Sequence, residues 1–196
     1  MGHDGRFQDS RRGLAHYADL LLVVCPRCGG RASVVPRPGL PELRYDTELL
    51  YRPRRLVCAG CGAMREWTAE RRGNALVGIT LGGPDEPFFG LPLWLQVPCC
   101  GQVLWAYNAR HLDVLDEYVA AGLRERTGWP AMSMLDRLPA WMKTAGNRTE
   151  VLRGVQRLRA LVDLSAPSDR PSAAAPRPDR ATGQEPAGSP YFRSPY

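Results

Sequence analysis

The 196-residue sequence predicts an α+β fold, in which an antiparallel β part is followed by a small helical part. Up to residue 107, short apolar runs alternate with turns rich in Gly and Pro, which is typical of strands in a small sheet. From residue 108, apolar residues recur at helical spacing. Two Cys-x-x-Cys pairs lie on turns of the β part, where a shared metal ion could join strands that have too small a core of their own.

We expect four segments along the chain. Residues 1–16 are polar and charged and are expected to form a disordered arm, and residues 17–107 form the β domain. Residues 108–164 form a helical segment, either packed on the β domain or separate from it. Residues 165–196 are rich in Pro, Ala and Ser, and such a composition buries too little apolar surface to offset the entropy of ordering. We therefore expect a disordered C-terminal tail.

The strands of the β domain are expected on either side of its turns. The segment 36–41 contains prolines, which remove the backbone donors of a sheet, so it is expected to be a loop. The segment 82–92 is expected to be a second long loop. The expected strands lie at 20–24, 32–35, 49–57, 64–68, 75–81, 93–97 and 102–107.

Three helices are expected after the β domain. The first begins near Asn108, a favourable N-cap residue. A shorter helix is expected at 132–143, ended or kinked by Pro139. The last begins at Asn147-Arg-Thr-Glu150, which has the outline of a capping box. Apolar residues at helical spacing mark the first helix at Leu112, Leu115, Val119 and Leu123 and the last at Val151, Val155, Leu158 and Val162.

The formal net charge of +6 is unevenly distributed. Residues 1–72 hold 13 Arg and 8 acidic residues, whereas residues 73–164 are balanced. A basic excess beside the cysteine pairs would suit a surface that faces phosphate groups. Arg accounts for all basic residues except Lys143, which also indicates a GC-rich genome, and codon bias alone can load a surface with Arg.

The cysteine pairs Cys25-Pro-Arg-Cys28 and Cys58-Ala-Gly-Cys61 share one pattern. Each pair is followed by a glycine, which lets the backbone turn with a positive φ. Two such turns supply four thiolates, the tetrahedral donor set that structural Zn²⁺ prefers and one that leaves no open position for a substrate. A pair of redox-active dithiols is the alternative, but a redox Cys-x-x-Cys normally stands alone at the start of a helix.

The two cysteine turns and their flanking strands resemble the zinc-ribbon family, in particular the ribbon of transcription factor IIB and of many bacterial proteins. The resemblance covers residues about 20–70. It implies one structural Zn²⁺ bound by Cys25, Cys28, Cys58 and Cys61 in a small antiparallel sheet. Twenty-nine residues separate Cys28 from Cys58, more than in a compact ribbon, and the extra length falls in the loop after Val35.

A third turn, Val97-Pro-Cys99-Cys100-Gly101, aligns with the first cysteine turn but has Val97 in place of the first cysteine. One interpretation is a second metal site formed by Cys99, Cys100 and His111, which would lack a fourth protein ligand. The favoured interpretation is a pair of buried thiols that pack as small apolar groups. A vicinal disulfide is the third and is disfavoured in a reducing compartment.

No catalytic pattern is evident, and we expect neither an enzyme nor a small-molecule substrate. The glycine pairs lack the Lys and the spacing of a phosphate-binding loop. The aromatic residues are expected to belong to the core rather than to stack on bases. This expectation applies to Phe88, Phe89, Trp94, Trp105, Trp129 and Trp141.

Nucleic-acid binding, in a regulatory or accessory role, is the function that the ribbon and its basic excess favour. Ribbons also serve in protein docking and as scaffolds, so the family resemblance alone does not select a function. Arg52, Arg54 and Arg55 could form one basic patch before the second cysteine turn. The candidate phosphate contacts are Arg27, Arg31, Arg52, Arg54, Arg55, Arg71 and Arg72.

Two other functions stay open. The first is a protein-docking module in which zinc is purely structural and Phe88, Phe89 and Leu91 form an apolar contact surface. The second is a thiol enzyme that uses Cys99 or Cys100, with His111 as the obvious base. A cytoplasmic location is expected, because the N-terminal residues lack the apolar core of a signal peptide and no apolar run is long enough to span a membrane.

Overall fold

The computed structural model describes residues 6–7, 9–121, 123–124 and 133–170, and every structural statement below concerns these residues. Residues 1–5 and 8 of the expected arm, most of the expected tail, Trp129 and the start of the expected second helix lie outside them.

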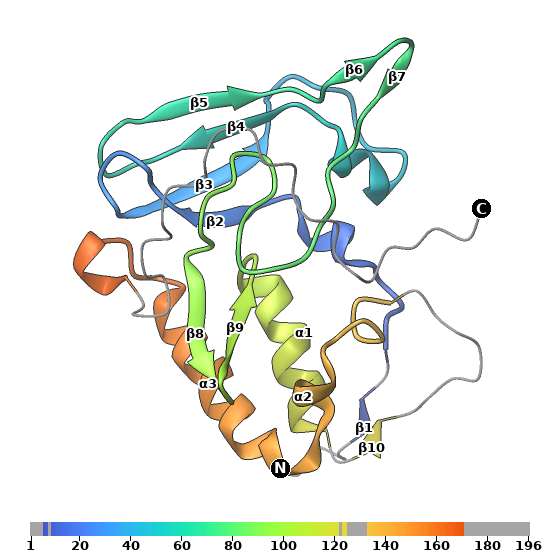
Figure 1. Ribbon diagram of the computed structural model, residues 1–196, viewed down its shortest axis with the longest axis vertical. Helices are drawn as coiled ribbons and strands as arrows, with labels where there is room; N and C mark the ends of the chain where they lie inside the picture. The colour runs from blue at the N-terminus through green and yellow to red at the C-terminus, as the bar shows by residue number, and fades with distance from the viewer. Residues whose placement is uncertain (1–5, 8, 122, 125–132, 171–196) are drawn as a thin grey trace.

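The cysteine turns belong to a four-stranded antiparallel sheet, which forms the upper layer of the molecule in Figure 1. Its strands follow one another in sequence order, as β2 (Leu21–Val24), β3 (Arg31–Pro36), β4 (Arg54–Val57) and β5 (Met64–Trp67). The α+β class with an antiparallel β part is therefore confirmed.

A second layer contains the hairpin β8 (Leu95–Cys99) and β9 (Gln102–Ala106), with α1 (Ala109–Ala120) and α3 (Arg148–Leu161) beside it (Figure 1). One cluster of buried apolar side chains runs through both layers. It includes Leu56 of the sheet, Leu104 of the hairpin and Leu158 of α3, each with 1% or less of its surface exposed. The helices therefore share the core of the sheet.

The two edges of the sheet differ. At the β2 edge, the backbone N–H of Trp94 donates to Leu22 O at 2.8 Å, and Leu22 N–H donates to Tyr107 O at 2.9 Å. Val24 N–H donates to Pro92 O at 2.9 Å. The chain on either side of the β8–β9 hairpin thus covers this edge. Within the described part of the chain, the backbone of β5 has no hydrogen-bond partner other than β4.

Two expected strands are shorter than predicted. The segment 49–57 contains the end of a 3₁₀ helix, η2 (Asp46–Leu50), and becomes a strand only at Arg54. Pro53, which has no N–H for a sheet, precedes that strand. The segment 75–81 contributes only β7 (Ala75–Leu76), which pairs with β6 (Arg71–Arg72).

The remaining short elements are β1 (Arg6–Phe7) paired with β10 (Leu123–Arg124), η1 (Leu14–Tyr17), η3 (Ala145–Asn147) and η4 (Pro167–Asp169).

The first and last helices are present, but the first ends at Ala120, so that Leu123, expected on its apolar face, lies instead in β10, and Val162 is the C-cap of the last. Asn108 is the N-cap of α1, and its Oδ1 accepts a hydrogen bond of 3.0 Å from His111 N–H. In α3, Val151, Val155 and Leu158 are fully buried. None of the described helices is both long and apolar enough to cross a membrane.

The expectations for the middle helix and for the capping box were wrong. Pro139 precedes α2 (Ala140–Lys143) as its N-cap instead of ending it, which suits a residue with a fixed φ and no N–H. Asn147 has helical backbone angles, and its side chain donates to Trp141 O at 3.0 Å. The carboxylate of Glu150 accepts from Cys100 N–H and not from the backbone of Asn147.

Candidate metal centre

The two Cys-x-x-Cys turns have the same backbone geometry. In the first turn, Cys25 N–H donates to Gly30 O at 2.7 Å and Gly29 N–H donates to Cys25 O at 2.9 Å. In the second turn, the equivalent bonds, from Cys58 N–H and Gly62 N–H, are both 2.9 Å long. Gly29 and Gly62 have φ values of 75° and 69°, which favour glycine.

The sheet brings the two turns together. Because β3 pairs with both β2 and β4, the β2–β3 and β4–β5 turns lie at the same end of the sheet (Figure 1). The Sγ atoms of Cys25 and Cys61 are 3.7 Å apart, as are those of Cys28 and Cys58. All four sulfurs lie within 4.8 Å of one another. The four predicted ligands therefore form one cluster that could hold a metal ion.

The cluster fits a tetrahedral thiolate site. A Zn–S bond of about 2.3 Å gives sulfur–sulfur edges of about 3.8 Å in a tetrahedron. The observed separations of 3.7 Å match that edge. Cys25 and Cys58 are buried, whereas Cys28 and Cys61 are half-buried, so the site lies at the surface of the core and is reachable by an ion from solvent.

The surroundings of Cys25 favour its thiolate form. Burial raises the pKa of the Cys25 thiol, but hydrogen bonds from the backbone N–H groups of Cys28 and Arg27, aided by the Cys58 and Cys61 thiols, outweigh it and lower the pKa to about 7. The Arg27 N–H lies 3.4 Å from Cys25 Sγ. A thiol that ionises near neutral pH binds a metal with little competition from protons.

The first cysteine turn is supported by the chain that follows α3. Arg31 N–H donates to Ser165 O at 2.9 Å, and the Arg31 guanidinium donates to Val162 O. A Cβ atom at Gly30 would lie 2.8 Å from Ser165 O, so only glycine allows this approach. The metal centre is therefore fixed on one side by the sheet and on the other by the end of α3.

The third turn forms a second, smaller cluster. Cys99 Sγ, Cys100 Sγ and a carboxylate oxygen of Glu150 lie within 4.8 Å of one another. Cys99 is buried, as expected for a packed thiol, but Cys100 is only half-buried. The two sulfurs are 3.8 Å apart and form no disulfide. Glu150, and not His111, is the third group in this cluster.

His111 lies elsewhere in the core. Its ring stacks on Tyr17 and contacts the rings of Trp105 and Tyr107. Its Nδ1 atom accepts a hydrogen bond of 3.2 Å from Tyr107 N–H. Burial lowers the pKa of His111 to about 3 and raises that of the Cys99 thiol to about 12. His111 is therefore not the third member of a metal site with Cys99 and Cys100, the interpretation that the sequence did not favour.

The candidate arginines do not form one patch. Arg54 is fully buried, whereas Arg55 pairs with Glu66 at 2.8 Å. Arg52 donates to Pro41 O, and Arg27 donates to Cys61 O at 3.4 Å. The strand alternation of β4 turns neighbouring arginines to opposite faces, so Arg54 is not available to a phosphate group while the sheet is folded.

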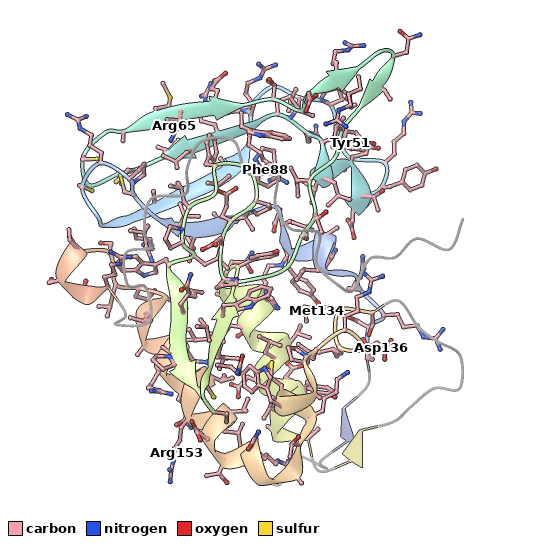
Figure 2. All side chains as sticks on the ribbon, viewed as in Figure 1. Tyr51, Arg65, Phe88, Met134, Asp136 and Arg153 are labelled. Carbon is pink, nitrogen blue, oxygen red and sulfur yellow. The ribbon has the colours of Figure 1, made fainter. Side chains whose placement is uncertain are left out.

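Arg71 and Arg72 are exposed on the β6–β7 hairpin, and Arg65 is exposed on β5. Figure 2 shows Arg65 beside the open edge of the sheet. Sequence reasoning missed Arg65 because it stands alone in β5, away from the clustered arginines that drew attention. Its guanidinium lies 5.5 Å from the Phe89 ring centroid.

The aromatic residues of the 82–92 loop face the sheet. Phe88 is 6% exposed, and its ring contacts Trp67 at 4.8 Å between centroids. Phe89 and Leu91 are partly buried against the same core. The expectation that the aromatic residues belong to the core is confirmed for Phe88 and also for Trp94, which is fully buried. The apolar contact surface expected at this loop is therefore largely covered.

Comparison of the chain with protein-family models, with curated proteins and with solved structures found no match. The four-cysteine cluster and its antiparallel sheet are consistent with a zinc ribbon.

Proposed function

We propose that this protein is a zinc-ribbon protein of the transcription factor IIB type, in which one structural Zn²⁺ holds the sheet and a basic margin binds the nucleic-acid backbone. The basic margin consists of Arg65, Arg71 and Arg72. The observation that carries the proposal is the exposure of these three arginines, Arg65 on β5, which follows the second cysteine turn, and Arg71 and Arg72 on the β6–β7 hairpin beyond the other end of β5 (Figure 1). The proposed role is regulatory or accessory and not enzymatic.

The charge balance of this region supports the proposal. Residues 20–81 contain ten arginines and five acidic residues. Glu66 is paired with Arg55, and Glu70 with Arg72 at 3.1 Å. Within the described residues, Arg65 and Arg71 have no carboxylate partner. Both can therefore exchange water for a phosphate oxygen without breaking an ion pair.

Phe88, Trp94 and Trp67 are not placed to stack on bases, whereas Tyr45 and Tyr51 are exposed. Base stacking needs exposed rings, yet Phe88 and Trp94 are buried and Trp67 packs on Phe88. Arginine contacts to phosphate carry little sequence information. We therefore expect the binding to be governed by salt and largely independent of sequence.

The test is a fluorescence-anisotropy titration of the zinc-loaded full chain with duplex DNA, single-stranded DNA and RNA at several salt concentrations. Each phosphate contact contributes about 0.9 to the slope of log K against log salt on duplex DNA. The variant Arg65→Gln/Arg71→Gln should lower the slope on duplex DNA by about two units. The control, Arg110→Gln/Arg153→Gln, removes two exposed arginines from α1 and α3, of which Arg110 pairs with Asp19 at 2.7 Å, and Figure 2 shows Arg153 at the opposite end of the molecule.

An unchanged slope in Arg65→Gln/Arg71→Gln, or an equal loss in the control variant, would contradict the basic margin. No binding of any nucleic acid at low salt would show that the arginine excess is only compositional.

A second candidate function, docking of an extended peptide, is favoured by the open β5 edge. Chain segments cover the β2 edge, while β5 presents its backbone groups without a partner in the described residues. The exposed pair Val57 and Met64 stands beside this edge, 41% and 62% exposed respectively. A peptide strand could add to β5 by backbone hydrogen bonds. Binding of such a peptide would depend little on salt, and it would be lost in the variant Val57→Lys/Met64→Lys.

A further inference from the structure

The turn between β8 and β9 places two thiols in a metal-binding arrangement apart from the four-cysteine cluster. Cys100 and Gly101 both have positive φ, 52° and 69°, and the second value equals that of Gly62 in the second cysteine turn. In this turn, Cys99 Sγ and Cys100 Sγ lie 3.8 Å apart. That separation is the sulfur–sulfur edge of about 3.8 Å expected when two thiolates bind one tetrahedral ion.

A third donor comes from a different element. Glu150, in the first turn of α3, accepts a hydrogen bond of 2.6 Å at Oε1 from Cys100 N–H. This bond holds the carboxylate over the turn, with an oxygen within 4.8 Å of both sulfurs. Fifty residues separate Glu150 from Cys100, so the cluster depends on the packing of α3 against β8.

We propose that Cys99, Cys100 and Glu150 form a second metal site, which takes a thiophilic divalent cation of the Zn²⁺ class. Both thiols bind through Sγ and release one proton each to solvent, so one M²⁺ forms two metal–sulfur bonds as two S–H bonds are lost. The Glu150 carboxylate supplies the third bond. Three protein ligands leave one position for a water molecule, as in open zinc sites.

The second site is weaker than the first for two reasons. It has two thiolates where the first has four, and Cys99 must lose its proton inside the core. In the metal-free state the Cys99 thiol donates to Glu150 O at 3.7 Å, a contact that ion binding would break. We therefore expect the four-cysteine site to fill first and the second site to exchange its ion with solvent.

The competing account is that the three groups form only a hydrogen-bonded network that joins the turn to α3. The two accounts differ in the number of ions bound and in the donor atoms. Titration of the reduced, metal-free full chain with Co²⁺ distinguishes them, because thiolate-to-cobalt charge-transfer absorption scales with the number of sulfur ligands.

Two equivalents of Co²⁺ are expected to bind in succession. The first should give the charge-transfer absorption of four thiolates, and the second should add about half of that intensity. Cys99→Ser and Cys100→Ser should each lose the second equivalent and keep the first. Glu150→Gln should weaken the second equivalent tenfold or more, whereas Glu117→Gln, which changes an exposed glutamate on α1, should leave it unchanged.

The first equivalent serves as the internal control for folding, because it requires the sheet that places all four cysteines together. A wild-type chain that binds only one equivalent would overturn the proposal. So would a second equivalent that persists in Cys99→Ser and Cys100→Ser. A second equivalent that depends on the cysteines but is unaffected by Glu150→Gln would overturn the assignment of the carboxylate.

Discussion

The guanidinium carbon of Arg54 lies 4.4 Å from the centroid of the Phe88 ring, and both side chains are buried. Arg54 also donates to Ala18 O and to Leu49 O, each at 2.7 Å. Burial lowers the pKa of Arg54 to about 10, so the side chain still carries its charge at neutral pH. One buried cation thus joins the loop, β4 and two backbone carbonyls.

Arg54→Met should destabilise the protein by about 2–5 kcal/mol, because it leaves two buried carbonyls without donors. The free energy of unfolding in urea, measured on the zinc-loaded chain, checks this. The neighbouring Arg55→Met is the matched control, since Arg55 is half-exposed and its ion pair with Glu66 contributes at most about 1 kcal/mol. Equal losses in the two variants would contradict the structural role of Arg54.

Glu86 should make stability depend on pH. Its carboxylate accepts hydrogen bonds from Phe88 N–H and Phe89 N–H, yet burial dominates and raises its pKa from 4.5 to about 7. The folded state therefore binds the proton more tightly than the unfolded state. The resulting stabilisation is complete below pH 4.5 and is lost as the pH rises through 7.

The variant Glu86→Gln has no carboxyl group to ionise at this position, so its stability should not show this fall as the pH rises through 7. The free energy of unfolding of the wild type, relative to Glu86→Gln, should fall by about 2–3 kcal/mol between pH 5 and pH 8. Urea unfolding of both proteins across this range measures it, and the contribution of the cysteines cancels in the difference. Parallel pH profiles would show that Glu86 is equally ionised in the folded and unfolded states.

Local patterns predicted much of the fold and of the metal centre. The Cys-x-x-Cys-Gly turns, the strands beside them and α3 all follow from residues within a few positions of one another. The four-cysteine cluster then needs only the antiparallel pairing of β3 with β4 to bring the turns together.

The features that sequence reasoning missed depend on distant contacts. Glu150 looked like part of a capping box, but the β8–β9 turn lies against the start of α3 and takes its carboxylate. Arg54 looked like a surface residue, because nothing local shows that the 82–92 loop covers that face of β4. The same loop hides Phe88. In each case, tertiary packing selects among residue roles that are equally compatible with the local sequence.

Loss of a single cysteine from the first centre should unfold the β part. Cys→Ser at position 25, 28, 58 or 61 removes one of four thiolates, and the small sheet depends on the ion for stability. We expect such a variant to lose its tightly bound zinc and its strand signal in circular dichroism, while Cys99→Ser keeps both. Metal analysis after dialysis checks the first point. A Cys28→Ser or Cys61→Ser variant that retains tightly bound zinc and four-thiolate Co²⁺ absorption would refute the site.

Gly154 should be intolerant of even a methyl group, because α3 crosses the β8–β9 hairpin at this residue. A Cβ atom there would lie 2.8 Å from Leu104 Cδ2 and 3.3 Å from Cys99 Sγ, and Leu104 is only 1% exposed, so it has little room to move. Overpacking of a core costs about 1–3 kcal/mol, whereas replacing glycine by alanine in a helix contributes up to about 1 kcal/mol.

The net expectation for Gly154→Ala is a loss of roughly 1–2 kcal/mol in the free energy of unfolding. Gly146→Ala is the matched control, since a Cβ atom at Gly146 meets nothing within 4 Å. It should change stability by less than about 0.5 kcal/mol. Because the added methyl group would also press on Cys99, Gly154→Ala should weaken the second equivalent of Co²⁺ and leave the first intact. A more stable Gly154→Ala variant would mean that α3 and the hairpin can separate without loss, and that the cluster of Cys99, Cys100 and Glu150 is not held rigidly by their packing.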